Sequence, residues 1–325
     1  GYYMKKNPFG KEGDFITSPL ISNLFGEMLA VWCVAFWEHL KKPKKIKIVE
    51  LGPGDGSLCN NLLKTFKNFK NFFECLEINL LEISDKLKVI QKTNIKSQKV
   101  KWIKDINEIN NDPVIFICNE FFDALPMKQL QKKRGVFFER FVTYSKNKYH
   151  LRTSYKKAKK SLVKKIKNLN LDSTNNIIEY PIKAIEYLNI VSKKIKKNRG
   201  GLLTFDYGYI NQNNQSTLQS VKKHKYTNIL NNPGQIDITY QINFKLFKKI
   251  LEKNNLSVEN IVPQNEFLQK MGILKRAEIL SKEMSFKDKA NMFYRLKRLL
   301  DYKEMGMLYK TMFAQKKGNK FSLGF

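Results

Sequence analysis

Residues 46–57 read IKIVELGPGDGS, and this stretch decides the fold. Its first half is apolar at four of six positions and rich in β-branched side chains, which predicts a short buried strand. Gly52, Gly54 and Gly56 then make a tight turn, because residues without a Cβ allow positive φ and let a ligand approach the backbone. We expect Ser57 to cap the helix that follows. A strand, a glycine turn and a helix N-terminus together form a site for an anionic or polar cofactor head.

The spacing of the glycines narrows the choice of cofactor. Dinucleotide-binding proteins use G-x-G-x-x-G, whereas this chain has Glu50-x-Gly52-x-Gly54-x-Gly56. An acid two residues before the first glycine is similar to motif I of class I S-adenosylmethionine (SAM) methyltransferases. On its own the turn is about as compatible with a tight strand-to-helix connection that binds no ligand. Choosing between a cofactor-binding turn and a turn without a ligand therefore requires the residues in the rest of the chain.

Length and composition limit the class of protein. With 325 residues, 42% of them hydrophobic, the chain can form one large α/β domain with an elaboration, or two domains. The most apolar run, residues 28–37, is too short to span a bilayer and is bracketed by Glu27 and Glu38, so we expect a buried helix and no membrane insertion. Gly1 is not an initiator methionine, and we expect the N-terminus to be incomplete.

The four cysteines are scattered, with no C-x-x-C pair and no histidine at ligand spacing. They predict reduced core thiols in a cytosol-like compartment, and neither a metal site nor a disulfide framework.

The net charge of +31 makes nucleic acid a candidate partner. However, the basic residues are overwhelmingly lysine, and phosphate recognition favours the rigid arginine fork. Lysines also run through the whole chain together with abundant Asn, Ile and Phe, which is typical of an AT-rich coding sequence. We prefer this compositional explanation and keep RNA contact as the minority interpretation.

Two further strands carry acids at their ends. Residues 75–82 read as a strand that ends in Glu82, and in a doubly wound sheet such an acid reaches the ribose hydroxyls of a nucleotide. The alternative is an ordinary acid in the first turn of the next helix. Residues 99–103 form a third strand, after which Asp105 could accept a hydrogen bond from an adenine amino group while Ile106 covers the ring.

The clearest buried strand after the first is 113–118, and Asn119, Glu120 and Asp123 follow it. Carboxylates beside the carboxyl end of a central strand sit where this architecture places its ligands, although they could also be helix-capping acids. A fifth strand, 200–205, ends in Asp206 and Tyr207, and Asp237 follows in a later loop.

The predicted fold is therefore a doubly wound, mostly parallel α/β sheet with a small β-hairpin and helical insertion between strands four and five. Residues 1–126 would form an N-terminal helical lid and the SAM-binding half, residues 127–181 an inserted substrate-facing subdomain, and residues 182–325 the second half. A hairpin is expected around residues 137–153, a helical excursion at 265–302, and final strands at 257–262 and 308–315.

Six strings in this order carry a family resemblance: GDFITSP at 13–19, ELGPGDG at 50–56, LEIS at 81–84, NEFFDALP at 119–126, DYG at 206–208 and FLQKMG at 267–272. Together they resemble the MidA family of bacterial and mitochondrial SAM-dependent methyltransferases. The resemblance implies a class I fold and SAM as cofactor. It also implies a protein partner, with arginine on a respiratory complex I subunit as the acceptor in the mitochondrial member. A bacterial cytoplasm, or the mitochondrial matrix in a eukaryote, is the expected location. Asp55 departs from the family, which often has arginine there.

The resemblance and the residues together give a set of roles. Gly52, Gly54 and Gly56 would hold the methionine end of SAM, Glu50 would steady that turn, Glu82 would hold the ribose, and Asp105 and Ile106 the adenine. For an arginine acceptor, Glu120 and Asp123 would pair with the guanidinium beside Asn119, with Asp206, Tyr207 and Asp237 as further substrate residues. Two alternatives stay open: methylation of RNA or a small molecule in the same pocket, and an assembly factor that keeps the fold without turnover.

Overall fold

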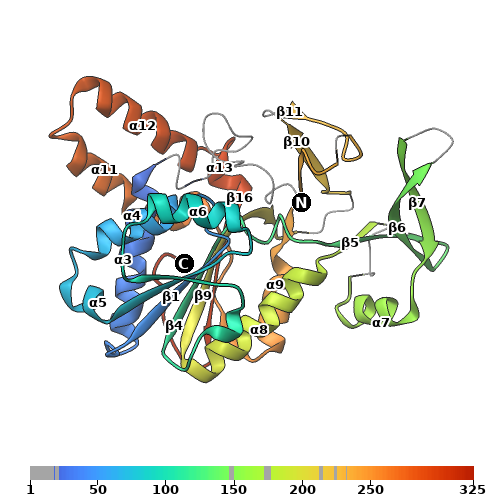
Figure 1. The fold of residues 1–325 in the computed structure, drawn as a ribbon, viewed down its shortest axis with the longest axis horizontal. Coiled ribbons are helices and arrows are strands. Elements are labelled where there is room, and N and C mark those ends of the chain that lie inside the picture. The colour runs from blue at the N-terminus through green and yellow to red at the C-terminus, as the bar shows by residue number, and fades with distance from the viewer. Residues whose placement is uncertain are drawn as a thin grey trace.

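The structure is a computed structural model that describes residues 18, 22–145, 150–171, 177–211, 215–222, 225–231 and 233–325. Its centre is a nine-stranded sheet in which the main strand order is β14-β16-β9-β4-β1-β2-β3 (Figure 1). The parallel strands are β1 (Ile46–Leu51), β2 (Leu76–Leu81), β3 (Val100–Ile103), β4 (Val114–Asn119) and β9 (Gly200–Tyr209). The antiparallel strands at the other edge are β14 (Leu256–Val258) and β16 (Tyr309–Lys316). The short strands β13 (Ile242–Asn243) and β15 (Val262–Pro263) pair with β9 and β16. The predicted mostly parallel α/β fold is confirmed.

Helices cover both faces of this sheet, which explains why β1 is buried at all six positions and apolar at four of them. Ile46 and Ile48 pack with α3 (Asn23–His39) and α4 (Ser57–Phe66) in one core cluster. Val49 and Leu51 pack with α8 (Ile182–Asn198) and α9 (Phe244–Lys253) in another. Alternate side chains of a strand point to opposite faces, so a strand buried on both faces has no polar face.

The start of the helix after the glycine turn differs from the sequence prediction by one residue. Gly56, in the left-handed conformation with φ +87°, is the N-cap of α4, and Ser57 is the first helical residue. Gly56 has no side chain to cap the helix, and the backbone N–H of Ser57 donates to Asp55 Oδ1 at 3.0 Å. The helix α3 begins after Ser22, whose hydroxyl accepts from the Leu24 N–H.

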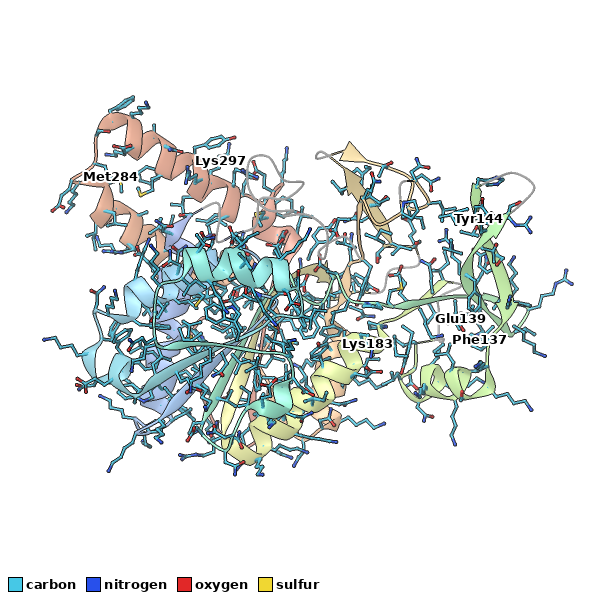
Figure 2. The ribbon with its side chains drawn as sticks, in the orientation of Figure 1. Phe137, Glu139, Tyr144, Lys183, Met284 and Lys297 are labelled. Atoms are coloured by element: carbon cyan, nitrogen blue, oxygen red, sulfur yellow. The ribbon has the colours of Figure 1, made fainter. Side chains whose placement is uncertain are left out.

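Residues 128–180 build a separate four-stranded antiparallel sheet beside the main one. Its strands are β5 (Lys128–Lys133), β6 (Val136–Ser145), β7 (His150–Lys157) and β8 (Ile177–Tyr180), in the order β7-β6-β5-β8. With α7 (Lys160–Asn168) it has its own small core around Phe137 and Ile166. The hairpin pairing of β6 with β7 agrees with the sequence prediction, whereas the hairpin turn lies outside the described residues. Figure 2 shows Phe137 and Glu139 in this sheet, away from the main one.

A helical excursion precedes the last strand. It contains α10 (Gln264–Lys270), α11 (Ile273–Ser281), α12 (Phe286–Leu300) and α13 (Met305–Leu308), with Met284 at its far end (Figure 2). The remaining described elements are α5 (Lys70–Cys75), α6 (Asp85–Asn94), the 3-10 helix η1 (Ile106–Glu108), and a three-stranded sheet of β10 (Gln219–Lys222), β11 (Lys225–Tyr226) and β12 (Asp237–Thr239). The strand predicted at 257–262 is split between β14 and β15. Among the described residues, no helix combines the length and apolar character that a membrane span requires.

Candidate active site

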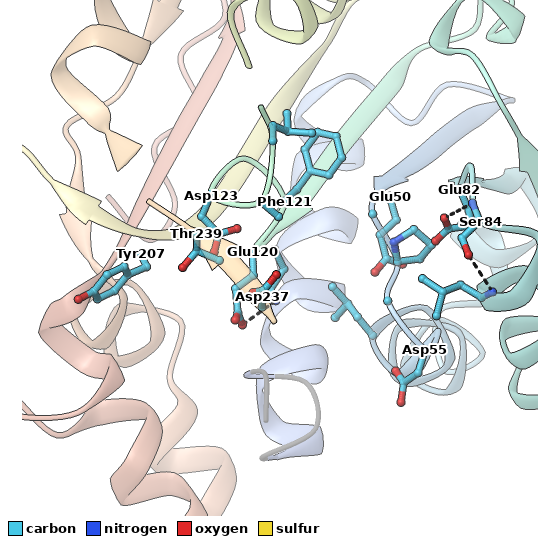
Figure 3. Close-up of a pocket in the computed structure, with 18 of the residues that line it drawn as sticks. Glu50, Asp55, Glu82, Ser84, Glu120, Phe121, Asp123, Tyr207, Asp237 and Thr239 are labelled. Atoms are coloured by element: carbon cyan, nitrogen blue, oxygen red, sulfur yellow. Dashed lines mark hydrogen bonds between the residues drawn. The ribbon is translucent and has the colours of Figure 1, made fainter. Parts of the chain in front are cut away.

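A cavity of about 660 Å³ lies at the carboxyl ends of the parallel strands (Figure 3). This is where open α/β sheets bind their ligands. One side is formed by the turn after β1 and by the end of β2, with Glu50, Asp55 and Glu82. The opposite side carries Glu120 and Asp123 after β4, with further side chains from β9, β12 and β16.

At Gly52 and Gly54 the turn lines the cavity with backbone atoms alone. Gly52 and Gly54 have φ values of +68° and +57°, which only glycine adopts without strain. A Cβ on Gly52 would lie 2.7 Å from the ring of Phe121, and a Cβ on Gly56 would lie 2.7 Å from Ile95 Cδ1. The predicted turn therefore needs its glycines for its backbone conformation and for the close packing behind it.

Glu82 is placed at the cavity wall and is held firmly. Its Oε1 accepts from the Ser84 N–H at 2.7 Å and its Oε2 accepts from Gln91 Nε2 at 3.0 Å. Burial raises the pKa of Glu82, and these hydrogen bonds partly offset that rise. A rigid carboxylate facing the cavity can accept hydrogen bonds from ligand hydroxyls.

Glu50 is the second acid on this side, and it is 3% exposed. Its Oε2 has no hydrogen-bond partner among the described residues. Burial, and then the charge of Asp55, raise the pKa of Glu50 to about 8. A buried carboxyl oxygen without a partner is costly unless a ligand supplies a donor or a positive charge.

Asp105 and Ile106 were expected at the adenine, and the structure places both outside the lining of the cavity. The Asp105 carboxylate caps η1 by accepting from the Asn107 N–H at 2.8 Å, and Ile106 is 1% exposed in the core. Neither residue lines the cavity. Ile83 and Leu87, which the sequence analysis did not single out, line it beside Glu82 instead.

Glu120 is the centre of the opposite side, where it is half-buried and lines the cavity. It has a positive φ of +53°, and its Oε1 accepts from the Ser18 N–H at 3.4 Å and from Asn119 Nδ2 at 3.3 Å. Its Oε2 accepts from the Tyr309 hydroxyl at 3.2 Å. Burial raises the pKa of Glu120 to about 7. Tyr309 has no local sequence signal, because β16 brings it to Glu120 from 189 residues further along the chain.

Asp206 supports this side from behind without lining the cavity. Its Oδ2 accepts from the Phe122 N–H at 3.0 Å and its Oδ1 from the Tyr207 N–H at 2.8 Å, so it fixes the loop after β4 to the end of β9. Burial and the charge of Glu120 raise the pKa of Asp206 to about 8.

Asp123 and Asp237 complete the acidic cluster. Both line the cavity, and Asp123 Oδ1 is buried without a partner among the described residues. Burial, followed by the charges of Asp206, Glu120 and Asp237, raises the pKa of Asp123 well above its usual range. Within the described part of the chain, no group of three or more His, Cys, Asp and Glu side chains has the arrangement of a metal site.

Tyr207 also lines the cavity, where its hydroxyl accepts from Gln241 Nε2 at 3.1 Å and its ring lies 6.0 Å from that of Tyr309. The structure therefore brings together ten of the predicted site residues, and Asp206 lies directly behind them. The ten are Glu50, Gly52, Gly54, Glu82, Asn119, Glu120, Asp123, Tyr207, Asp237 and, through the turn, Gly56.

Comparisons with known proteins agree with this geometry. A family model described as "Putative S-adenosyl-L-methionine-dependent methyltransferase" matches residues 28–262. The chain is 30% identical over 314 residues to the mitochondrial protein arginine methyltransferase NDUFAF7 of Xenopus tropicalis, covering 88% of this chain and 71% of that protein. The human protein of the same name is 28% identical over 338 residues, covering 94% and 74%.

A solved structure has the same fold. It is that of a superfamily member from Burkholderia thailandensis bound to S-adenosyl-homocysteine, with a TM-score of 0.81 at 21% identity, covering 98% of this chain and 84% of that one. The family match spans most of the chain and includes both sides of the cavity. This chain belongs to that family of SAM-dependent methyltransferases.

Proposed function

We propose that this methyltransferase methylates an arginine side chain of a protein. The observation that carries the proposal is the acidic cluster at one side of the cavity, in which Asp237 is buried and Glu120 and Asp123 are half-buried. None of the described residues that line the cavity is Lys or Arg, although the chain has 60 of them against 29 acids. A cationic guanidinium is the acceptor that this local charge favours. The NDUFAF7 relatives, which are named protein arginine methyltransferases, support the same acceptor.

On the cofactor side, Gly52, Gly54 and Gly56 would leave room for the methionine end of SAM, and Glu50 would face its positive charge. Glu82 would accept hydrogen bonds from the ribose hydroxyls. When bound, SAM supplies an electrophilic methyl group on a sulfonium sulfur. Alignment and exclusion of water are the main contributions of the protein to such a transfer.

On the acceptor side, Glu120 and Asp123 would pair with the guanidinium and orient one nitrogen toward the methyl group. Tyr309 and Asn119 fix the Glu120 carboxylate for this task through their hydrogen bonds. The nitrogen gains a methyl group and loses one proton, which a carboxylate of the cluster would receive. Arginine resists deprotonation, so we place this proton loss late in the transfer or after it.

The test is a transfer assay with labelled SAM and an arginine-containing peptide, combined with isothermal titration of SAM. We expect Glu120→Gln to abolish transfer and to bind SAM as the parent chain does. The control is Glu283→Gln, which changes an exposed glutamate between α11 and α12. Transfer by Glu120→Gln at the parental rate would contradict the assigned role. Absence of SAM binding to the parent chain would support the alternative of an assembly factor without turnover.

RNA is the second candidate acceptor, and the lysine-rich composition favours it. An RNA methyltransferase would bind RNA with an affinity that falls steeply with added salt, and it would transfer label to RNA. Binding without transfer would leave the arginine proposal in place. We propose a respiratory complex I subunit as the protein acceptor and a bacterial cytoplasm or mitochondrial matrix as the location. These two assignments rest on the family resemblance and on the mitochondrial names of the relatives.

A further inference from the structure

Gln91 on α6 has an unusual position for an amide side chain, because it is 0% exposed and touches three segments of the cofactor side at once. Its Nε2 donates to the Gly54 carbonyl at 2.8 Å and to Glu82 Oε2 at 3.0 Å. Its Oε1 accepts from Trp102 Nε1 on β3 at 2.9 Å. One side chain thus links the glycine turn, the end of β2 and the end of β3.

The chemistry of these contacts fixes the amide in one orientation. The indole N–H of Trp102 can only donate. The Gly54 carbonyl can only accept, and so can the Glu82 carboxyl group when it is ionised. A flipped amide would set donor against donor at Trp102 and acceptor against acceptor at the other two contacts. Trp102 therefore acts as the anchor that directs both N–H groups of Gln91 toward the turn and Glu82.

We propose that Gln91 is a positioning residue for SAM binding, which holds Glu82 and the Gly54 turn at a fixed separation, with Trp102 orienting it. This inference rests on the cofactor side of the proposed function, because Glu82 and the glycine turn are its two ends. The amide does not line the cavity and would not touch the cofactor. Its effect would pass through the two groups that do line it.

The same helix provides a matched control. Asn94 Nδ2 donates to the Asp55 carbonyl at 2.9 Å, so it too ties α6 to the glycine turn, but from an exposed position and without a link to Glu82. A general role of α6 in supporting the turn would be disturbed by changes at either residue. A role in positioning Glu82 would be disturbed only by changes at Gln91 or its anchor.

The experiment measures the SAM dissociation constant by calorimetry and the acceptor KM at saturating SAM. A hydrogen bond to a charged group contributes enough that Gln91→Met should weaken SAM binding by roughly 10- to 100-fold. We expect Asn94→Ala to change it less than about twofold, and the acceptor KM to stay constant in both variants. Trp102→Phe should give an intermediate loss, and adding it to Gln91→Met should cause little further loss, because both act through one contact.

A pH profile separates positioning from simple support. The Gln91 N–H favours the ionised form of Glu82, so its removal should move the midpoint of SAM affinity to higher pH. Asn94→Ala should leave that midpoint unchanged. If Gln91→Met does not fold, Trp102→Phe, which keeps the amide, carries the same test. Parental SAM affinity in Trp102→Phe and Gln91→Met would overturn the positioning role, whereas a parent chain that binds no SAM would overturn the proposed function itself.

Discussion

Burial of Glu50 predicts that its contribution to the stability of the ligand-free protein falls as the pH rises from 4.5 to about 8. The folded state keeps the proton of Glu50 up to a pKa of about 8, whereas an unfolded glutamate loses it near 4.5. Between these values the folded state binds more protons, so the stability contribution is complete below pH 4.5 and is lost as the pH rises through 8. For this one group the loss between pH 6 and pH 8 is roughly 2 kcal/mol.

The perturbation that isolates this contribution is Glu50→Gln, which keeps the shape of the side chain and removes its titration. Urea unfolding of the ligand-free parent and variant at pH 6 and pH 8 gives the difference in their free energies of unfolding. We expect the parent to lose about 2 kcal/mol more than the variant over this range. Glu283→Gln should behave as the parent does. An equal pH dependence in the parent and Glu50→Gln would refute the argument that Glu50 is held neutral by burial.

Three further predictions concern the site. Gly52→Ala should lower the free energy of unfolding by about 1–3 kcal/mol in urea unfolding, because its φ of +68° and the adjacent ring leave no room for a Cβ. Tyr309→Phe should move the acidic limb of the kcat profile to higher pH, since the hydroxyl favours ionised Glu120; an unmoved limb would contradict this. Asp105→Ala should leave the SAM dissociation constant within about twofold, while Glu82→Ala should raise it at least tenfold. Calorimetry that shows equal losses for these two variants would support the adenine assignment.

The sequence allowed prediction of the features that are local along the chain. The apolar runs and glycines around Gly52 predicted the first strand and turn, and acids at strand ends predicted Glu82 and Glu120, because parallel strands share one carboxyl edge. The same rule pointed to Asp105, which lies outside the cavity lining and caps the 3-10 helix that follows its strand at once. An acid after a strand can serve either purpose, and only the path of the next residues decides between them.

What could not be predicted comes from contacts between distant segments. Tyr309 reaches Glu120 because β16 inserts antiparallel beside β9, and no local pattern indicates that insertion. Gln91 looks like an ordinary polar residue of a solvent-facing helix turn, yet Trp102 and Glu82 enclose it. Burial of a polar side chain depends on neighbours that the sequence does not place next to it.

The acidic cavity beneath a lysine-rich exterior has a consequence for selectivity. Polyanions are attracted to a surface with a net charge of +31, but a phosphate that moves inward meets the carboxylates of Glu120, Asp123 and Asp237. The basic surface would then bind nucleic acid, while the acidic cluster would keep its phosphates out of the cavity, so that bound nucleic acid need not be a substrate. A cationic group at the end of a long, narrow side chain would instead be able to enter the cavity and reach these carboxylates.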